Sequence, residues 1–514
     1  MQSLSEQPTL LVRGHWLFPG GSQPEIAIRD GALAIHNEKI LEVGAWPDLQ
    51  QRYPSVKVLG SDRHALLPGL INAHHHSQGA SHIQHGIPDQ LLESWLLDLA
   101  RRRGADPFLV TQLAAARLLQ AGVTSVVDVH SGHGSSEVFA NDLDRRLKAY
   151  ETAGIRVALA TGVSRQSFLI WGDDQAFLDS LPEEVQTLAR RRLPGPDAVT
   201  EDDYFDVFDQ FWQRYANHPR IDLWFAPPGP QWVSDDFLLR IVDAAEQYDT
   251  GVQTHLEESI YEKHYGPRVY GMPTIMHLQQ LGVLSPRFSC AHGVWLTAPE
   301  IEILARSGAA VSHNPSSNLR LRAGIAPLNA MLAAEVTMAL GMDGTTINDN
   351  EDMWQEMRLA LRLHRSPRLD RPAPTHADIF RLATSGGASL LRAADQRGAL
   401  AVGYQADVVL LDLNRITWPW VAPEADPLGL ILYRAAAGDV DTVLIGGEVV
   451  VENGRVKTVD EAAVAQELAA SLAGTDYPAE DAAMVEALLP HVEKFYQEWE
   501  LQALEPYLVH NSRI

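Results

Sequence analysis

The middle of the chain alternates between short apolar runs and longer amphipathic stretches. Most runs precede a stretch with apolar residues every three or four positions, as in DDFLLRIVDAAEQY (235–248). A repeated strand-then-helix order predicts a parallel sheet with helical crossovers. Eight units over about 320 residues favour an α/β fold, a (β/α)8 TIM barrel with insertions, and a doubly wound open sheet is the alternative. The runs are ALLPGLI (65–71), GVTSVVDV (122–129), RVALATGV (156–163), IDLWFAPP (221–228), TGVQTHL (250–256), RFSCAHGV (287–294), AAVSHNP (309–315) and VTMALGMDG (336–344).

The two ends of the chain have another pattern, in which β-favouring residues are broken by Gly, Asp and Asn. We predict that residues 1–62 and 395–457 together form a small β-sandwich domain beside a barrel over 63–394. Residues 458–514 look helical and acidic, which indicates an arm for packing or oligomerisation. The segment 165–203 is longer than a crossover needs, so it predicts a lid or a subunit contact, with a surface insertion as the alternative.

Composition narrows the classes of function. The formal charge of −25 disfavours binding to nucleic acid and to anionic membranes. No run is long and apolar enough for a membrane span, and the N-terminus shows no secretion signal, so we expect a cytoplasmic protein. With one cysteine, Cys290, any metal site must use His, Asp and Glu.

Three consecutive histidines follow the first apolar run, in INAHHHSQG (71–79). Side chains alternate between the two faces of a strand, so His74 and His76 point together while His75 points away. Two imidazoles at this spacing can grip a divalent cation.

The same position recurs at the ends of other predicted strands. His255, His292, His313 and Asp343 end the fifth to eighth runs. Because the carboxyl ends of barrel strands meet at one mouth, we expect these residues to converge there with His74 and His76.

These motifs resemble the amidohydrolase superfamily, in the branch of chlorotriazine hydrolases, guanine deaminases and S-adenosylhomocysteine/methylthioadenosine deaminases. The resemblance covers roughly residues 8–456 and implies a metal-dependent hydrolase that attacks a C–N type bond, by deamination in the first hypothesis, in a nitrogen heterocycle. The residues that carry it are PGLINAHHH (68–76), HLEE (255–258), AHGVWL (291–296), HNPSSNLRL (313–321), GIAPL (324–328), GMDGTT (341–346), DMWQEMRLAL (352–361), ATSGGA (383–388) and GALAVGYQADVVLLD (398–412).

The resemblance also implies roles for single residues. One divalent metal, zinc first, with iron(II) or manganese as alternatives, would be held by His74, His76, His255 and Asp343, with a water or hydroxide in the open position. Glu258 would shuttle protons, His292 would hold and polarise the water or substrate, and Asp343 would also accept a proton. The expected substrate-side residues are His313, Asn318, Gln231 and Trp95.

Two departures from relatives affect this picture. Nucleoside-type deaminases carry a histidine where the fourth strand ends, and this chain has Pro228, Gly229, Pro230 and Gln231 there, which makes recognition of adenosine doubtful. Binuclear relatives use a carboxylated lysine on that strand, and no lysine lies between Lys148 and Lys263. The second departure favours a mononuclear site.

Several alternatives stay open at this stage. The leaving group could be an alkylamine, halide or sulfide instead of ammonia, or the enzyme could open a cyclic amide. A non-catalytic scaffold is disfavoured because all the ligand types are present. We expect a small-molecule substrate and a homo-oligomer, a dimer or larger. Solvated roles are favoured for four loop histidines and for two arginines at strand-like positions: His82, His85, His130, His133, Arg320 and Arg322.

Overall fold

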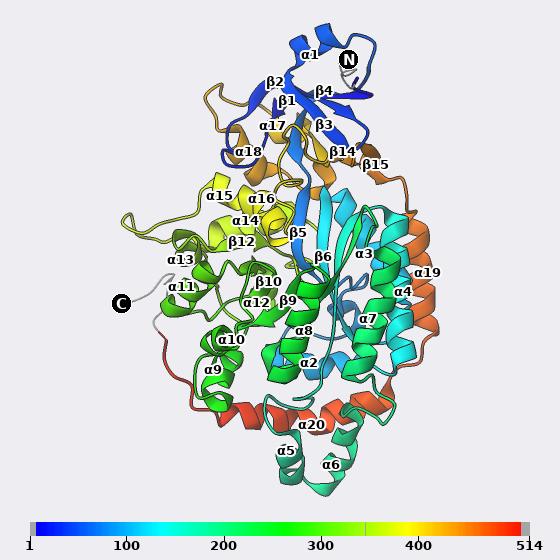
Figure 1. Cartoon of the computed structure of the whole chain (residues 1–514), viewed down its shortest axis with the longest axis vertical. Helices are drawn as coiled ribbons and strands as arrows, with labels where there is room; N and C mark the ends of the chain where they lie inside the picture. Colours follow the sequence, from blue (N-terminus) through cyan, green and yellow to red (C-terminus); the bar gives the residue numbers. More distant parts are fainter. Residues whose placement is uncertain (1–6, 345, 505–514) are drawn as a thin grey trace.

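The computed structural model describes residues 7–344 and 346–504. The outer parts of two predicted domains, residues 1–6 and 505–514, and residue 345 of the predicted barrel lie outside these ranges. Figure 1 shows a mixed sheet at the top, a barrel below it and helix α20 across the lower end. No helix in the described ranges is both long and apolar enough to cross a membrane.

The barrel is the main part of the fold. Over the described ranges eight parallel strands pair in chain order, so the open-sheet alternative is wrong. All eight predicted runs contribute a strand, and most strand residues are buried apolar side chains. The strands are β5 (Leu70–His75), β6 (Val123–Gly132), β7 (Arg156–Val163), β8 (Ile221–Phe225), β9 (Val252–Leu256), β10 (Phe288–His292), β11 (Ala310–His313) and β12 (Thr337–Leu340).

Amphipathic helices cover the outside of the barrel (Figure 1). In α8, for example, Ser234 caps the first turn, and Phe237, Leu238, Ile241 and Ala245 form the buried face. The helices between barrel strands are α2 (Leu92–Asp98), α3 (Pro107–Gln120), α4 (Ser136–Ala153), α5 (Asp174–Ser180), α6 (Glu183–Ala189), α7 (Glu201–Tyr215), α8 (Asp235–Gln247), α9 (Ile260–Val269), α10 (Thr274–Leu281), α11 (Ala298–Ser307), α12 (Pro315–Arg320) and α13 (Leu328–Ala333). After β12 come α14 (Met353–Leu363), α15 (His376–Leu382) and α16 (Ser385–Leu390).

The last and first strands meet at the mouth of the barrel. A parallel bridge joins His75 to Asp343, and the Asp343 N–H donates to the carbonyl of His74 over 2.8 Å. This closure places Asp343 beside the histidine pair, although more than 260 residues separate them in the chain.

Both flanks of the chain contribute to the second sheet. Its order within the described ranges is β16-β15-β14-β13-β4-β1-β2-β3. β4 continues to Pro68, past the predicted domain boundary at residue 62, and enters β5 through Gly69. A Cβ at Gly69 would lie 2.1 Å from Thr124 Oγ1, so only glycine fits. The elements are β1 (Leu10–Leu17), β2 (Ile28–His36), β3 (Lys39–Ala45), α1 (Trp46–Arg52), β4 (Lys57–Pro68), β13 (Val408–Asp412), α17 (Leu413–Thr417), α18 (Pro427–Arg434), β14 (Val440–Ile445), β15 (Glu448–Glu452) and β16 (Arg455–Val456).

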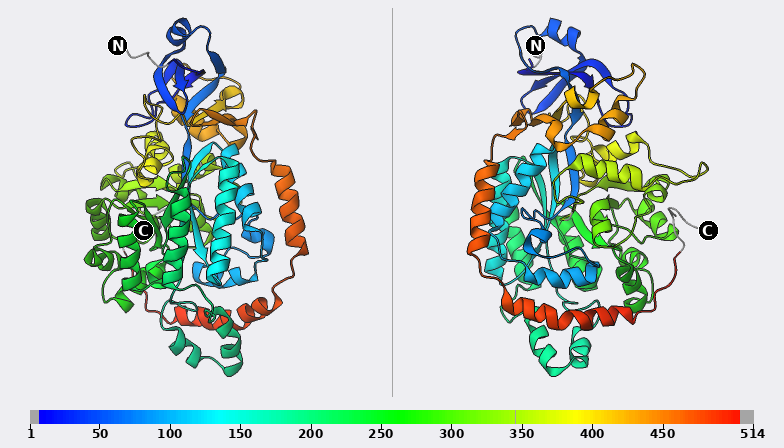
Figure 2. Two further views of the ribbon diagram at one scale, coloured as in Figure 1. Left: turned by 45° about the vertical axis from the view of Figure 1, so that its right-hand side comes forward. Right: turned by 180° about the vertical axis from the view of Figure 1, so that it is seen from behind.

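The C-terminal arm wraps around the barrel (Figure 2). Helix α19 (Glu461–Gly474) runs along α3, and α20 (Ala479–Gln497) crosses the end of the barrel where the strands finish. Apolar residues of α20, of α2 and of the insertion 165–203 share one buried cluster, which includes Trp95, Trp171 and Tyr496. The insertion and the arm therefore form a second layer over the mouth.

Candidate metal and catalytic site

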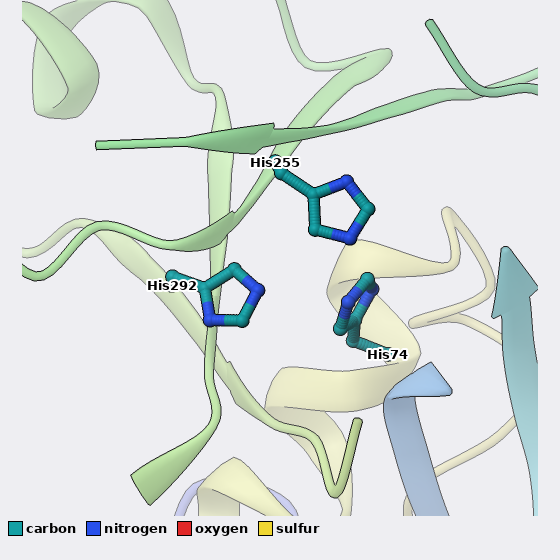
Figure 3. Close-up of side chains that lie close together, drawn as sticks. All are labelled: His74, His255 and His292. Atoms are coloured by element: carbon teal, nitrogen blue, oxygen red, sulfur yellow. The ribbon is translucent and has the colours of Figure 1, made fainter. Parts of the chain in front are cut away.

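Six polar side chains from the ends of four barrel strands meet at the mouth of the barrel. His74 lies near the end of β5 and His76 just after it, His255 lies near the end of β9, His292 ends β10 and Asp343 follows β12. Glu258 lies just beyond β9. In Figure 3 the rings of His74, His255 and His292 point toward one another.

The ligand atoms lie within reach of a single cation. His76 Nε2 is 3.2 Å from His255 Nε2 and 3.1 Å from Asp343 Oδ1. His74 Nε2 is 3.7 Å from the same oxygen, and His292 Nε2 is 3.8 Å from Asp343 Oδ2. Sets of three ligand atoms drawn from these residues fall within 4.8 Å of one another.

Hydrogen bonds behind the rings fix which nitrogen faces the centre. His76 Nδ1 donates to the Val129 carbonyl over 2.8 Å, and His255 Nδ1 donates to the Pro228 carbonyl over 2.7 Å. A carbonyl only accepts, so both Nε2 atoms carry lone pairs. His74 Nδ1 likewise donates to Gln253 Oε1 over 2.9 Å, and the buried His74 Nε2 has no hydrogen-bond partner.

This donor set fits a divalent metal. Nitrogen lone pairs of the imidazoles face one another and a carboxylate across a buried space. These electron-rich atoms repel one another unless a cation lies between them. Burial lowers the pKa of His74 well below its usual range. Burial, and then the neighbouring His76 and His292, lowers the pKa of His255 to about 3. The rings of His74 and His255 are therefore neutral at physiological pH, as metal binding requires. For His76 the effect of burial is outweighed by the hydrogen bond and charge of Asp343, which raise its pKa, so metal binding there displaces a proton more readily at higher pH.

The carboxyl group of Glu258 stands beside this cluster. Its Oε2 lies 3.4 Å from His292 Nε2, and its buried Oε1 has no hydrogen-bond partner. Burial, and then the charges of Glu262, Asp343 and Glu93, raises the pKa of Glu258 well above its ordinary value. A raised pKa favours the protonated form of the carboxyl group, which can donate a proton to a bound substrate.

A neighbouring glutamate holds the Glu258 backbone in place. The Glu258 N–H donates to Glu262 Oε2 over 2.6 Å, and Gln231 Nε2 donates to Glu262 Oε1 over 2.7 Å. Ser259 caps α9 and also donates to Glu93 on α2. The loop that carries Glu258 is thus tied to the end of β8 and to the layer over the mouth.

An ion cluster stabilises the same loop. Lys263 is buried and donates to both oxygens of Glu257 and of Glu300. The carbonyl of Glu257 accepts from Val294 N over 3.0 Å, which joins the β9 and β10 loops.

We expect Lys263→Met to destabilise the fold by about 3–5 kcal/mol, because two buried carboxylates lose their cation. Urea denaturation followed by fluorescence would measure the change. Lys148→Met is the matched control: the Lys148 side chain is 52% exposed and pairs only with Asp144 on α4, so its effect should stay below about 0.5 kcal/mol. Equal effects of the two changes would contradict a structural role for the cluster.

The predicted substrate-side residues have different surroundings. Asn318 Oδ1 lies 2.9 Å from His292 Nδ1, and its buried Nδ2 has no partner. His313 Nε2 lies 2.9 Å from His364 Nε2. Gln231 contacts Glu262, and Trp95 packs edge-on against His82. The structure brings Asn318 and Gln231 next to His292 and the Glu258 loop, and it does not bring His313 into the ligand set.

Two further sequence expectations can be compared with the structure. His75 points away from the cluster as expected, with Nε2 3.0 Å from Glu351 Oε2. The solvated role for Arg320 is wrong. Arg320 lies in helix α12, not in a strand, because Pro315 starts a helix there. Its side chain is mostly buried and forms ion pairs with Asp89 and Asp349.

Sequence reasoning missed Gln253, which lies two residues before His255 on the same face of β9. It is fully buried, and its Nε2 donates to the Ala73 carbonyl over 3.0 Å, which orients its Oε1 toward His74. The available signal was a glutamine two residues before a predicted ligand, on the same face of the strand. Glu262 and the Lys263 cluster left no comparable signal.

We expect Gln253→Leu to weaken metal binding about 10–100-fold, because His74 loses the acceptor that fixes its tautomer. Titration against a zinc chelator of known affinity would measure it. Gln253→Glu preserves an acceptor and should bind metal at least as tightly as the Leu variant. If Gln253→Leu bound metal as tightly as the unchanged protein, this orienting role would be excluded.

The comparisons with known proteins agree with this geometry. The sequence pattern of the amidohydrolase family matches residues 65–450. A 5-methylthioadenosine/S-adenosylhomocysteine deaminase from Syntrophomonas wolfei is 31% identical over 460 residues, 87% of this chain and 95% of that protein. A 5'-deoxyadenosine deaminase from Methanosarcina mazei is 28% identical over 446 residues, 86% and 92% of the two chains.

Solved structures give the same result for the fold. An adenosine deaminase from Xanthomonas campestris with bound zinc has a TM-score of 0.76 and 27% identity, and the match covers 91% of this chain and 99% of that one. An atrazine chlorohydrolase from Arthrobacter aurescens TC1 complexed with zinc shares the fold, with a TM-score of 0.74, 24% identity and coverage of 90% and 100%.

A barrel with a buried cluster of histidines and one aspartate at its mouth defines a metal-dependent hydrolase. The chain belongs to the amidohydrolase family. It is a hydrolase that acts on carbon–nitrogen bonds other than peptide bonds.

Proposed function

We propose that the protein is a zinc-dependent aminohydrolase that removes ammonia from an amino-substituted carbon of a nitrogen heterocycle. The observation that carries the proposal is the buried Glu258 carboxyl, whose Oε1 has no partner, beside inward-facing Nε2 atoms and Asp343. His74, His76, His255 and Asp343 would hold the metal. When bound, a divalent cation lowers the pKa of a water molecule toward neutrality.

Asp343 and Glu258 each carry out different proton transfers in this proposal. Asp343 Oδ2 accepts a hydrogen bond from Ser317 over 2.6 Å, which leaves its other oxygen to face His76. In this proposal Asp343 accepts a proton from the attacking water, and Glu258 gives its proton to the ring nitrogen next to the carbon attacked. His292, held at Nδ1 by Asn318, directs its Nε2 at the attacking oxygen or at the substrate. The proton held by Asp343 then passes to the amino group, which leaves as ammonia. The hydroxyl proton on the attacked carbon returns to Glu258 as the carbon–oxygen double bond forms, so both carboxyl groups regain their starting states and the ring carbon keeps the oxygen of water.

The curated relatives support an amino-substituted purine-like ring, since they are named as deaminases of adenosine analogues. The end of β8 differs from the nucleoside-type pattern, because Gln231 stands where those relatives have the histidine-containing stretch. Gln231 binds Glu262 and so supports Glu258. We therefore propose an amino-heterocycle without requiring a ribose, with Trp95, Asn318, Gln231 and His313 as its surroundings.

The proposal is tested by incubating zinc-loaded protein with 5'-deoxyadenosine, aminopurines, aminopyrimidines, pterins and aminotriazines. Ammonia release coupled to a change in ring absorbance is the expected result for at least one class. Release of halide, alkylamine or sulfide without ammonia, or ring opening to an acid, would replace deamination by that reaction. Zinc binding without any reaction on the whole panel would contradict an aminohydrolase of these rings.

A cytoplasmic location and assembly into a dimer or larger oligomer stay predictions. We propose the oligomer because helices α5 and α6 of the insertion project beyond α20 at the lower end of the molecule (Figure 1). Sedimentation velocity on the full chain would decide the assembly, and a single species near the mass of one chain, 56.7 kDa, would contradict it.

A further inference from the structure

A group of basic side chains lies beside the metal cluster and has no role in the proposed chemistry. Arg102 follows the short helix Leu99–Arg101, Arg146 lies in α4, and His130 lies in β6. His133 directly follows β6, and β6 pairs with β5, the strand that carries His74 and leads into His76.

Contacts connect Arg102 to the metal cluster through one side chain. Arg102 Nη1 donates to Gln78 Oε1 over 2.5 Å. The Gln78 side chain packs beside Gly344, where an added Cβ would lie 3.3 Å from Gln78 Cγ. Gly344 N donates to Asp343 Oδ1 over 2.6 Å. Arg102 therefore stands next to the residues that flank the predicted ligand Asp343.

Neither arginine has an acidic partner in the described ranges. Arg102 donates to Gln78, and Arg146 donates to the hydroxyl of Thr111 over 3.2 Å and keeps a buried Nε with no partner. Their sequence neighbours differ, because Arg101 pairs with Asp98 and Arg145 pairs with Asp106. The chain has a formal charge of −25, so two neighbouring arginines without an ion-pair partner are unusual. Their positive charge would attract an anion from outside the protein.

The electrostatics of the group point the same way. Burial of the guanidinium, and then the charge of Arg146, lowers the pKa of Arg102. Burial, and then Arg146 and His133, lowers the pKa of His130 well below its usual range. Asp142, 3.4 Å from His130 Nε2, offsets only part of this positive charge. A bound anion would relieve the remaining repulsion.

The group also lies on the accessible side of the metal cluster. The His76 side chain is 23% exposed, whereas His74 is fully buried. Part of the Arg102 side chain reaches solvent, although the protein packs around its guanidinium. Buried His82, with no partner on either ring nitrogen, lies within electrostatic range of Arg102, Asp343 and His76. A substrate ring at His76 would thus lie near Arg102, and Arg146 acts on Arg102 through its charge.

We infer that Arg102 and Arg146 form an anion subsite that binds a carboxylate on the substrate's side chain while its ring lies at the metal cluster. A guanidinium fork matches a carboxylate by paired hydrogen bonds. The inference rests on the proposed function and narrows its substrate to acid-bearing heterocycles.

The experiment measures binding, so it does not depend on turnover. Calorimetry at pH 8 compares 3-(imidazol-4-yl)propionate with its uncharged primary amide on zinc-loaded full-length protein. We expect the acid to bind about tenfold or more tightly than the amide. Arg102→Gln and Arg146→Gln should each bring the two affinities within about threefold, and Arg102→Lys should retain part of the preference.

The neighbouring arginines provide matched controls. Arg103 contacts the Thr475 carbonyl of the arm and Arg145 pairs with Asp106. Arg103→Gln and Arg145→Gln remove the same formal charge and should retain the full preference for the acid. Zinc content and melting temperature, measured on each variant, identify any that fails to fold.

Equal affinities of acid and amide for the unchanged protein would overturn the subsite, and so would a preference that survives both Arg102→Gln and Arg146→Gln. A loss of preference in the control variants as large as in these two would reduce the effect to overall charge and also overturn it. The proposed function fails separately, by absence of ammonia release from any ring, and that result would leave a measured preference for the acid in place.

Discussion

Glu258→Gln is expected to lower kcat about 10²–10⁴-fold while the bound metal stays at one per chain. Glutamine has the same shape and keeps the backbone hydrogen bond to Glu262, but it carries no proton that it can give to a ring nitrogen or take back. Glu258 Oε1 has no protein partner, so the change leaves no broken protein contact there. Ammonia release gives kcat, and elemental analysis gives the metal content.

Glu302→Gln is the control for this prediction. Glu302 lies on the exposed face of α11 in a surface pair with Arg306, so kcat should stay within about twofold. A Glu258→Gln protein that retained most of its kcat would exclude Glu258 as the proton shuttle. Loss of metal in that variant would instead place Glu258 among the ligands.

Asp343→Ala is expected to reduce zinc affinity by more than about 100-fold. This exceeds the loss expected for a residue that only orients a ligand, because Asp343 is itself a predicted ligand. Turnover should fall to background. Asp343 lies within 4 Å of His74, His76 and His292, and its negative charge offsets the charge of the cation that the imidazoles bind. Its backbone also closes the barrel against β5. Removing the side chain retains that backbone pairing, so the fold should survive.

Zinc affinity is measured by competition with a chelator, and melting temperature without metal reports the fold. Asp370→Asn, on an exposed loop with Arg368 as its partner, should change neither. Normal zinc affinity in Asp343→Ala would show that the metal site lies elsewhere.

The sequence pattern allowed the barrel to be predicted because each strand is a short apolar run followed by an amphipathic helix. The ligands were predictable for a related reason: a histidine or aspartate at the end of an apolar strand interrupts that run where barrel strands converge. His74 and His76 also show the two-residue spacing that places both rings on one face of β5.

The support around the ligands could not be predicted in the same way. Gln253 orients His74 across the barrel from a different strand, and Glu262 fixes Glu258 through a backbone N–H. Such contacts join residues from different strands and helices, so a pattern within one short stretch of sequence does not predict them. Arg320 shows the opposite error, because alternation suggested a strand where Pro315 begins a helix.

The packing of the layer over the mouth could not be predicted from the sequence either. Trp95, the insertion and α20 come from three distant parts of the chain, and their shared cluster follows from where the arm ends its path around the barrel. The helical character of the arm was predictable from its sequence, but the surface on which it packs was not.

The most direct test of the account is a crystal structure of zinc-loaded protein with anomalous data collected at the zinc edge. We predict one strong peak at the barrel mouth, about 2.0–2.2 Å from the Nε2 atoms of His74, His76 and His255 and from one oxygen of Asp343. No peak there, or a peak with Asp343 outside its coordination sphere, would contradict the account.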